Sequence, residues 1–255
     1  MLAICLQSGS NGNCVYVESD GVGLLLDAGI SGVQAERRLA QFGRDIRQVR
    51  AVIISHDHKD HIRCAGVYQR KFGLPVYVTA KTLAAACRWQ SLGALAEVRH
   101  FTAGQCLTLG RMTVETIPTP HDGADGVVFV VACRGKRLGV FTDLGHVFAD
   151  LRKAVRSVDA ALLESNYDPE MLERGPYPAF LKGRIKGPGG HVSNEESAEL
   201  LLSAGGRLKW ACLAHLSEQN NEPELALATH RRVHGARVPL LAASRYQATG
   251  PLEIP

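Results

Sequence analysis

Short apolar runs separated by turns rich in glycine and asparagine open the chain. The runs LAICLQ, CVYVES and VGLLLDAG each have the length of a β-strand, and the stretches between them read SGSNGN and DG. Runs of this length bounded by such turn residues predict strands that are linked by hairpins. We therefore expect the fold to begin with antiparallel strands.

Farther along the chain, strand patterns alternate with patterns typical of helices. We expect helices over residues 34–42, 62–72, 81–92, 151–157, 194–203 and 223–233. Ser193 and Glu196 have the spacing of a capping box, which predicts the start of the helix over 194–203. We expect further strands at QVRAVIIS, LPVYVT, AALLES, LKWACLAHLS and RVPLLAAS. Repeated apolar runs over residues 98–141 predict a second sheet of mostly antiparallel strands.

Helices and strands interleave without a linker or a repeat of fixed period. This arrangement predicts one layered α/β domain over residues 1–255. The segment RGPYPAFLKGRIKGPGG, residues 174–190, differs from the rest because it is rich in glycine and proline and carries four basic residues and no acid. Glycine and proline interrupt regular structure, so we expect a mobile loop here.

The composition is that of an ordinary globular protein. Hydrophobic residues make up 45% of the 255 positions, which is enough for a sizeable core, and nothing indicates disorder. Lysine and arginine number 29 and aspartate and glutamate 25, so the formal net charge is +4. An excess this small permits an anionic partner but excludes binding to nucleic acid by charge alone.

The seven cysteines lie at positions 5, 14, 64, 87, 106, 133 and 212, with no Cys-x-x-Cys pair. This spacing indicates neither a disulfide framework nor a thiolate zinc site, and it fits a reducing compartment. The N-terminus has no basic region before a long apolar run, and no stretch approaches the roughly 18 apolar residues of a membrane span. We expect a cytoplasmic protein without a membrane partner.

The densest cluster of potential metal ligands is His-Asp-His-Lys-Asp-His at residues 56–61. It follows AVIIS, a buried-strand pattern, so we expect the cluster at the carboxyl end of a strand. Solvated turns favour glycine, proline, asparagine and serine over clustered histidine. Imidazole and carboxylate together suit zinc, manganese or iron rather than calcium.

The stretch SHDHKDH resembles the His-x-His-x-Asp-His signature of the metallo-β-lactamase superfamily, and later motifs of that family follow in order. Asp27 in LDAG resembles the strand-end aspartate that orients the metal loop through hydrogen bonds. His121 in TPHD, Asp143 in VFTDLG and His215 in CLAHLS match a metal-binding histidine, the metal-bridging carboxylate and the last metal-binding histidine. The resemblance implies an α/β fold of four αββα layers, with two mixed sheets between helices.

The resemblance also implies two divalent metal ions per chain, and the donor chemistry agrees. His56, His58 and His121 would offer one ion three nitrogens and leave a position open for water, as a catalytic zinc site requires. Abundance and affinity favour zinc for so many histidines, and manganese is the alternative.

The second ion would be held by Asp60, His61 and His215, and Asp143 would bridge the two ions. Asp60 is also expected to orient the attacking water. Each cation stabilises a deprotonated water near neutral pH, and such a pair suits in-line displacement at phosphorus.

The second half of the chain resembles the tRNase Z-like phosphodiesterases. LLESNYD and GGHVSNEESAELL are similar to the glutamate-containing strand end and the Gly-His-x-Ser/Thr helix start of those enzymes. Carried over, His191 is the expected general acid and Glu164 its carboxylate partner, which would fix the tautomer of the imidazole. Ser193 and Asn194 begin a helix, whose N-terminal N–H groups favour a phosphate, so we expect both residues to bind substrate.

Four stretches extend the resemblance to the YycJ (WalJ) branch of small bacterial members of the superfamily. They are LQSGSNGNCVYVES, LLESNYD, YPAFLKGRIKGPGGHVSNEES and LAHLSEQNN. The resemblance implies a metal-dependent 5′-to-3′ DNA exonuclease linked to DNA repair. Lys182, Arg184 and Lys186, with Tyr177 and Phe180 nearby, would let the expected loop pair phosphates and stack bases.

Only 71 residues separate Asp143 from His215, too few to hold the β-CASP domain of larger nucleases of the superfamily. Alternatives to a DNA exonuclease therefore stay open. One is a small-molecule hydrolase, such as a thioesterase of the glyoxalase II type, which would not need a protonating His191. Others are an RNA-processing nuclease and a regulatory protein on a retired hydrolase scaffold. The predicted metal ligands are all present, which argues against the last.

Overall fold

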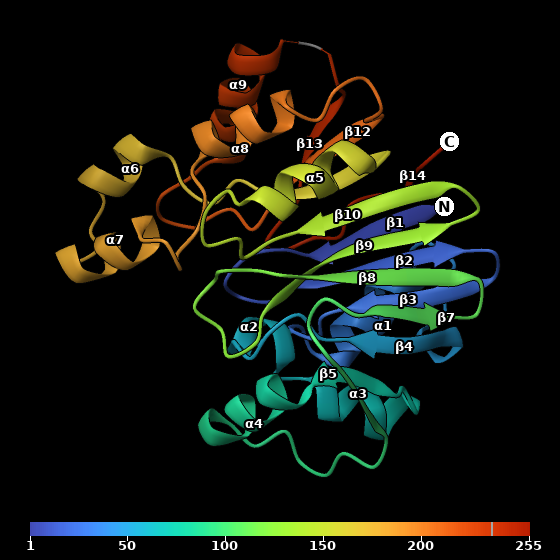
Figure 1. Ribbon diagram of the computed structural model, residues 1–255. Helices are drawn as coiled ribbons and strands as arrows, with labels where there is room; N and C mark the ends of the chain where they lie inside the picture. The colour runs from blue at the N-terminus through green and yellow to red at the C-terminus, as the bar shows by residue number, and fades with distance from the viewer. Residues whose placement is uncertain (236) are drawn as a thin grey trace.

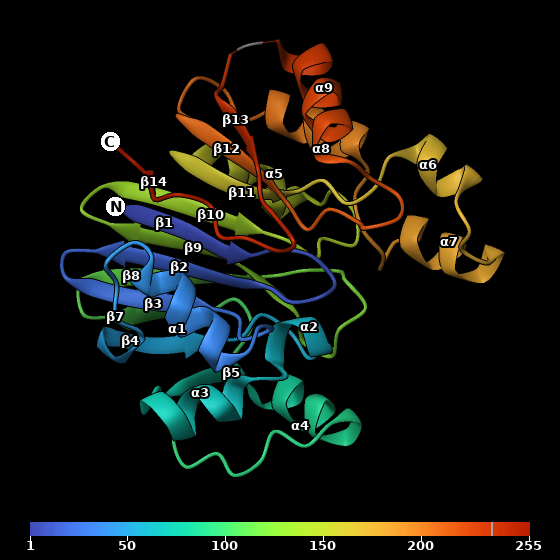
Figure 2. The same cartoon turned by 180° about the vertical axis from the view of Figure 1, so that it is seen from behind.

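Two sheets pack face to face between layers of helices in the computed structural model, which describes residues 1–235 and 237–255 (Figure 1). This arrangement is the four-layer αββα sandwich that the sequence predicted, so the expected fold class is confirmed. Both chain ends lie side by side, because the last strand pairs with the first (Figure 2).

Within the described residues the first sheet has seven strands in the order β14-β1-β2-β3-β4-β5-β6. They are β1 (Leu2–Gln7), β2 (Cys14–Ser19), β3 (Val22–Leu26), β4 (Val49–Ile53), β5 (Val76–Thr79), β6 (Val98–Phe101) and β14 (Leu252–Glu253). The pairs from β14 to β3 are antiparallel, and the pairs from β3 to β6 are parallel. The hairpins expected at the start of the chain are confirmed.

The second sheet, over the same described residues, also has seven strands, in the order β13-β12-β11-β10-β9-β8-β7. They are β7 (Cys106–Leu109), β8 (Met112–Pro118), β9 (Val127–Cys133), β10 (Lys136–Phe141), β11 (Ala160–Glu164), β12 (Trp210–Ala214) and β13 (Leu240–Ala242). The pairs from β7 to β10 are antiparallel and those from β10 to β13 are parallel. Both sheets are therefore mixed.

One strand of the region 98–141, β6, belongs to the first sheet rather than to the second sheet that was predicted for this region. β6 pairs in parallel with β5, with Val76 opposite Val98, at the edge of the first sheet. The helix between the two strands carries the chain back to the start of the sheet, as a parallel pair requires. The apolar run alone does not distinguish these two sheets, so the sequence prediction was wrong for this strand.

Helices cover the outer face of each sheet. The first sheet is covered by α1 (Gly32–Ala40), α3 (Ala65–Phe72) and α4 (Ala80–Trp89), and α2 (Lys59–Ile62) is a short helix after β4. The second sheet is covered by α5 (Ala149–Ser157) and α8 (Asn194–Leu202), with α9 (Pro223–His234) packed beside α8. A 3-10 turn, η1 (Ile46–Gln48), precedes β4. No helix in the described part of the chain combines the length and hydropathy needed to cross a bilayer.

Alternating side chains of each strand point to opposite faces, and in the central strands both faces are buried, whereas β7 alternates between exposed and buried positions. In β1, Ala3 and Cys5 face the core between the two sheets, whereas Ile4 and Leu6 face the helices. A strand buried on both faces has no polar alternation, which explains why these central strands read as continuous apolar runs.

The segment 174–190 is not the loop that the sequence predicted. It contains α7 (Ala179–Lys186) and follows α6 (Pro169–Arg174), and the two helices form an arm that projects from the sandwich (Figure 1). Glycine and proline mark the ends of these helices, because Gly175 ends α6, Pro178 precedes α7 and Gly187 ends α7. Such positions suit residues that break helices, so the composition of the segment was compatible with helix after all.

Candidate metal centre

The predicted site residues follow the carboxyl ends of parallel strands in both sheets. Asp27 follows β3 and His56 follows β4 in the first sheet, while Asp143 follows β10, Glu164 ends β11 and His215 follows β12 in the second. Parallel strands end at the same edge of a sheet, and the two sheets place these edges against each other. Residues far apart in the sequence therefore meet at one edge of the sandwich.

Three of these strand-end residues have a left-handed backbone. The φ angles are 67° for Asp27, 61° for Asp143 and 55° for His215. A residue other than glycine in this region costs about 1–3 kcal/mol, and such strain gathers at functional sites. The turn redirects the chain directly after the strand and leaves each side chain buried at the sheet edge.

The side chains form two adjacent groups of potential ligands. In one group the nearest ligand atoms of His56, His58 and His121 lie within 4.8 Å of one another. In the other group, the nearest ligand atoms of Asp60, His61 and His215 also lie within 4.8 Å of one another.

Asp143 lies between the two groups. Its Oδ1 is 3.5 Å from His121 Nε2 and 3.6 Å from His215 Nε2, and its Oδ2 is 3.2 Å from His61 Nε2. One carboxylate can therefore reach a metal ion in either group.

Unpaired buried atoms indicate that the site fits metal ions. Among the described residues, His56 Nε2, Asp143 Oδ2 and His215 Nε2 are buried and have no hydrogen-bond partner. Leaving such an atom unsatisfied costs about 1–3 kcal/mol each, which a metal–ligand bond would offset. Imidazole and carboxylate are the donors of zinc, manganese and iron sites, so the residues present fit a pair of such ions.

The opposite nitrogens of the imidazole rings are held by the protein. His61 Nδ1 donates to Asp27 Oδ2 at 2.7 Å, and Asp27 also accepts a hydrogen bond from Ser55 N at 2.8 Å. His121 Nδ1 donates to the carbonyl oxygen of Gly190 at 2.8 Å. These partners orient each ring so that Nε2 faces the cluster, as the ligands of metal sites usually require.

Asn13, Ser8 and Gly29 also lie at the site, although no role was predicted for them from the sequence. Asn13 Nδ2 lies 3.1 Å from Asp60 Oδ2, and Asn13 N donates to the carbonyl oxygen of Asp60 at 2.7 Å. Ser8 Oγ accepts a hydrogen bond from His215 N at 2.8 Å. Gly29 packs so closely that a Cβ would lie 1.6 Å from the carbonyl oxygen of Asp60. The turn SGSNGN was interpreted as a hairpin connection and as part of a stretch typical of the YycJ (WalJ) branch, but its contact with the metal-ligand loop was not predicted.

His191 and Glu164 form a close pair beside the cluster. His191 Nδ1 lies 2.7 Å from Glu164 Oε1 and 3.8 Å from Asp143 Oδ1. Glu164 is fully buried, and its Oε2 accepts hydrogen bonds from Leu144 N at 3.0 Å and Val192 N at 3.4 Å. The carboxylate is therefore held on both oxygens, and it leaves Nε2 of the His191 ring available for another partner.

Charge and burial shift the pKa values of these groups in opposite directions. Burial holds the pKa of His56 well below its ordinary value. Burial would also lower the pKa of His215, but the carboxylates of Asp143, Asp60 and Glu164 raise it to about 10. Although burial opposes it, the charge of His191 lowers the pKa of Glu164 to about 2. Although burial opposes it, the neighbouring histidines also hold the pKa values of Asp60 and Asp143 well below the ordinary range. All three carboxylates are therefore ionised near neutral pH, as ligands and hydrogen-bond acceptors require.

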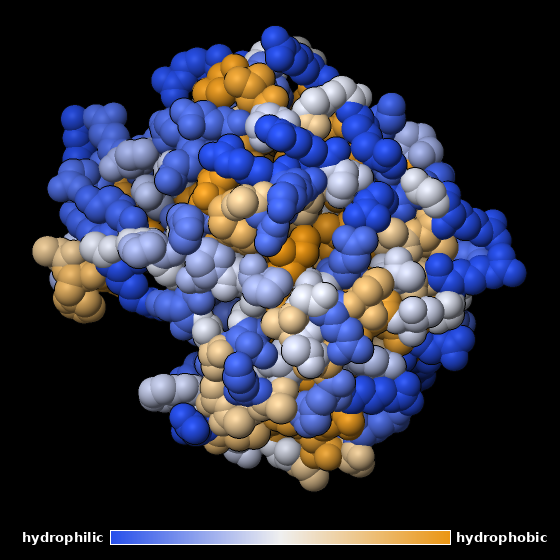
Figure 3. Space-filling model, viewed as in Figure 1, coloured by the Kyte–Doolittle hydropathy of each residue, from blue (hydrophilic) through white to orange (hydrophobic). Residues whose placement is uncertain are grey.

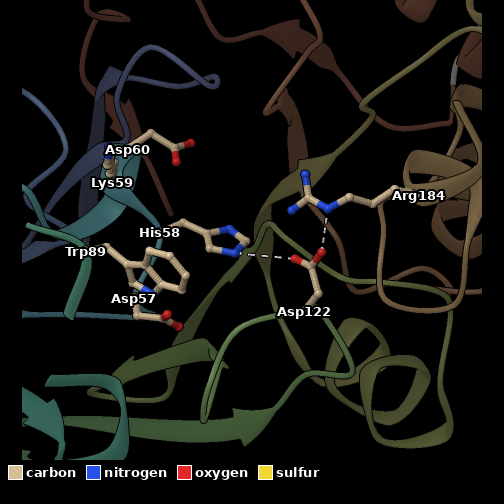
Figure 4. Close-up of a pocket in the computed structure, with 7 residues that line it drawn as sticks. All are labelled: Asp57, His58, Lys59, Asp60, Trp89, Asp122 and Arg184. Atoms are coloured by element: carbon tan, nitrogen blue, oxygen red, sulfur yellow. Dashed lines mark hydrogen bonds and ion pairs between the residues drawn. The ribbon is translucent and has the colours of Figure 1, made fainter. Parts of the chain in front are cut away.

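A cleft of about 530 Å³ opens next to the cluster (Figure 4). It is lined by Asp57, His58, Lys59, Asp60, Trp89, Asp122 and Arg184. Asp122, which the sequence analysis did not single out, lies with Oδ1 3.4 Å from His58 Nε2 and accepts a hydrogen bond from Arg184 Nε at 2.7 Å. Asp122 thus links α7 to a predicted metal ligand.

The other residues predicted to bind substrate lie away from the cleft or are engaged in the fold. Lys182 Nζ donates a hydrogen bond to the carbonyl oxygen of Glu173, and Lys186 Nζ forms an ion pair with the carboxylate of Glu173 at 3.1 Å. Ser193 accepts a hydrogen bond from Glu196 N, in the capping box that the sequence predicted. Asn194 is fully buried, and its Oδ1 accepts a hydrogen bond from Ser165 Oγ at 2.6 Å. Of the residues predicted to bind substrate, only Arg184 is among those that line this cleft.

Comparison with known proteins identifies the family. The sequence profile of the β-lactamase superfamily domain matches residues 23–215, so the chain belongs to that family. The structure superposes on the metallo-β-lactamase fold protein YhfI from Bacillus subtilis with a TM-score of 0.75, at 16% sequence identity and over 98% of each chain.

Curated relatives match at higher identity. The chain is 36% identical to exodeoxyribonuclease YycJ of Bacillus anthracis over 228 residues, which are 87% of this chain and 84% of that protein. It is 37% identical to exodeoxyribonuclease WalJ of Streptococcus pneumoniae over 227 residues, which are 88% of this chain and 84% of that protein. The resemblance to the YycJ (WalJ) branch that the sequence motifs indicated is therefore confirmed.

Proposed function

We propose that this protein is a metal-dependent phosphodiesterase that acts on nucleic acid, and that it is a 5′-to-3′ DNA exonuclease of a single domain without a β-CASP insertion. The observation that carries the proposal is the His191–Glu164 pair beside two adjoining groups of metal ligands. A phosphodiester releases an alkoxide, which is a poor leaving group, so a positioned proton donor is the feature that distinguishes this reaction from thioester hydrolysis. The names of the two curated relatives support DNA as the substrate.

Two divalent ions, zinc in first place and manganese as the alternative, would be held by seven side chains. These are His56, His58, Asp60, His61, His121, Asp143 and His215. When bound, the ions would supply positive charge that stabilises the phosphorane-like transition state and lowers the pKa of the attacking water.

The residues of the chain have separate tasks in this mechanism. Asp60 accepts a hydrogen bond from Asn13 that holds its carboxylate in place, and this carboxylate would orient the attacking water. Glu164 accepts a hydrogen bond from Nδ1–H of His191, so Nε2 of His191 is the atom that protonates the leaving oxygen. Arg184 lines the cleft and can pair a phosphate of the strand. The site thus contains groups for attack, for protonation and for holding the chain of phosphates.

A gel assay with 5′- and 3′-labelled DNA and RNA, single- and double-stranded, tests the proposal in the presence of zinc or manganese. Asp60→Ala should abolish shortening and His191→Ala should slow it strongly, whereas His100→Ala, which removes an exposed histidine of β6, should leave the rate unchanged. The position of the retained label gives the polarity. Hydrolysis of a thioester without need of His191, and no cleavage of any nucleic acid, would overturn the proposal.

Cleavage of RNA but not of DNA, slowed strongly by His191→Ala, would assign the enzyme to RNA rather than DNA. Metal analysis of the purified protein identifies the native ion, and fractionation of cells tests the expected cytoplasmic location. A role in DNA repair is tested by the mutation rate of a strain that carries the Asp60→Ala variant.

A further inference from the structure

A large exposed aromatic side chain stands on one wall of the cleft. Trp89, the last residue of α4, is 72% exposed and lines the cleft together with Asp57, His58 and Asp60 (Figure 4). Tryptophan is rarely left this exposed, because its ring offers a large apolar area to burial. The side chain makes no contribution to the core clusters, so the fold does not explain it.

A second exposed aromatic residue lies on α7, the helix that contributes Arg184 to the cleft, although it is not itself among the residues that line the cleft. Phe180 of α7 is 78% exposed. Arg184, which lines the cleft, lies four residues later in the same helix, and side chains with this spacing share one face. Phe180 therefore stands one turn farther out on the face of α7 that borders the cleft. The space-filling view shows a mostly hydrophilic arm with a small apolar cluster at its outer tip, and a notch between the arm and the part of the molecule that contains α4 (Figure 3).

Charge alone does not explain what the cleft would bind. Lys59 and Arg184 supply positive charge, but Asp57, Asp60 and Asp122 line the same cleft. Metal ions would neutralise part of the acidic charge, yet phosphate contacts by themselves would leave both aromatic residues without a role. Flat aromatic rings beside a phosphodiester site suit stacking of nucleobases, which every base permits.

We propose that Trp89 is a stacking platform for an unpaired nucleobase next to the metal centre, with Phe180 contacting the strand from α7. The proposal rests on the proposed function and makes it more specific, because base pairs within a duplex are covered on both faces by their neighbours, whereas the unpaired bases of a single strand offer free faces. The cleft is thus a binding site for the single-stranded end of a nucleic acid, read without base specificity.

Tryptophan fluorescence tests this directly. The chain has two tryptophans, and the other one, Trp210, is 8% exposed with its Nε1 bonded to the carbonyl oxygen of Glu253. The metal-loaded protein is titrated with an oligothymidylate whose phosphorothioate linkages resist cleavage. Stacking predicts quenching of the exposed indole, which should be absent in Trp89→Phe and absent with an abasic oligomer of the same length and charge.

Affinity is measured separately by the anisotropy of a labelled oligothymidylate. Trp89→Ala should weaken binding by about 5- to 150-fold, the range expected for one stacked base, and Trp89→Phe by less. Tyr246→Ala is the matched control, because Tyr246 is also exposed, at 62%, but is not among the residues that line this cleft. Both variants at position 89 change an exposed side chain at a helix end, so circular dichroism should be unchanged.

Binding and cleavage are measured independently and fail independently. Affinity of Trp89→Ala within twofold of the wild type, or equal quenching by the abasic oligomer, would overturn the stacking platform even if the protein degrades DNA. A wild-type protein that binds the oligomer with quenching but never cleaves nucleic acid would instead overturn the proposed function.

Discussion

Replacing His191 by alanine should slow the cleavage of DNA far more than the cleavage of an activated phosphodiester. In the structure, His191 Nδ1 donates a hydrogen bond to the buried carboxylate of Glu164 at 2.7 Å. The opposite ring nitrogen is therefore free to protonate the leaving oxygen. DNA releases an alkoxide, which needs a proton, whereas p-nitrophenolate leaves without one. A comparison of the rates on the two substrates therefore distinguishes a proton donor from a residue that only supports the fold.

The expected magnitudes follow from the chemistry of this pair. A positioned general acid contributes about 10²–10⁴ in rate, which corresponds to roughly 3–5 kcal/mol of barrier. Glu164→Gln keeps the shape but removes the charge, and a hydrogen bond to a charged group is worth about 1.5–3 kcal/mol. The glutamine variant should therefore lose about 10- to 150-fold on DNA, less than the alanine variant at His191.

The assay measures kcat/KM for a DNA oligonucleotide and for methyl p-nitrophenyl phosphate with each metal-loaded variant. On the activated substrate both variants should remain within about tenfold of the wild type, because no proton is needed. Metal content measured by mass spectrometry controls for a disturbed centre. Equal losses on the two substrates would refute the assignment of His191 as proton donor.

Three further outcomes are expected. Gly29→Ala would force a Cβ to 1.6 Å from the carbonyl oxygen of Asp60, so denaturant unfolding should show a loss of about 3 kcal/mol or more together with lower metal content. Gly183→Ala, in the interior of α7 with open space around it, is the control and should stabilise by up to about 1 kcal/mol; equal stability of the two variants would contradict the packing argument. Burial, with a smaller contribution from His234, lowers the pKa of His230 to about 4. The unfolded chain then binds more protons between pH 6.5 and 4, so the free energy of unfolding should fall as the pH falls through this window, by about 3 kcal/mol in all. A His230→Gln variant should lack this component in unfolding curves measured at each pH, and an unchanged pH slope would disprove it. Chelation of the metal ions should lower Tm by about 5–10 °C in calorimetry, since binding at a hundredfold excess over Kd is worth about 2.7 kcal/mol per site. No difference in Tm between the chelated and the metal-supplemented protein would contradict a resident metal pair.

Local patterns in the sequence predicted most of the elements, because each depends on neighbouring residues. The apolar runs predicted the hairpins of β1 to β3, and the capping box of Ser193 and Glu196 predicted the start of α8. The same local rules misread residues 174–190, where glycine and proline mark the ends of helices rather than a loop. Composition does not distinguish a residue that breaks a helix from one that merely ends it.

The sequence by itself also determined the candidate ligands and the family, because His56 to His61 form one continuous motif and the later motifs follow in order. Only the tertiary structure decided which other residues serve them. Asn13 reaches Asp60 across 47 positions, and Asp122 joins Arg184 to His58 from another loop. Trp89 is separated from every motif and acquires a place beside the site only because α4 ends at the cleft. Such contacts depend on how parallel strands of two sheets end at one edge, and a one-dimensional pattern carries no record of that geometry.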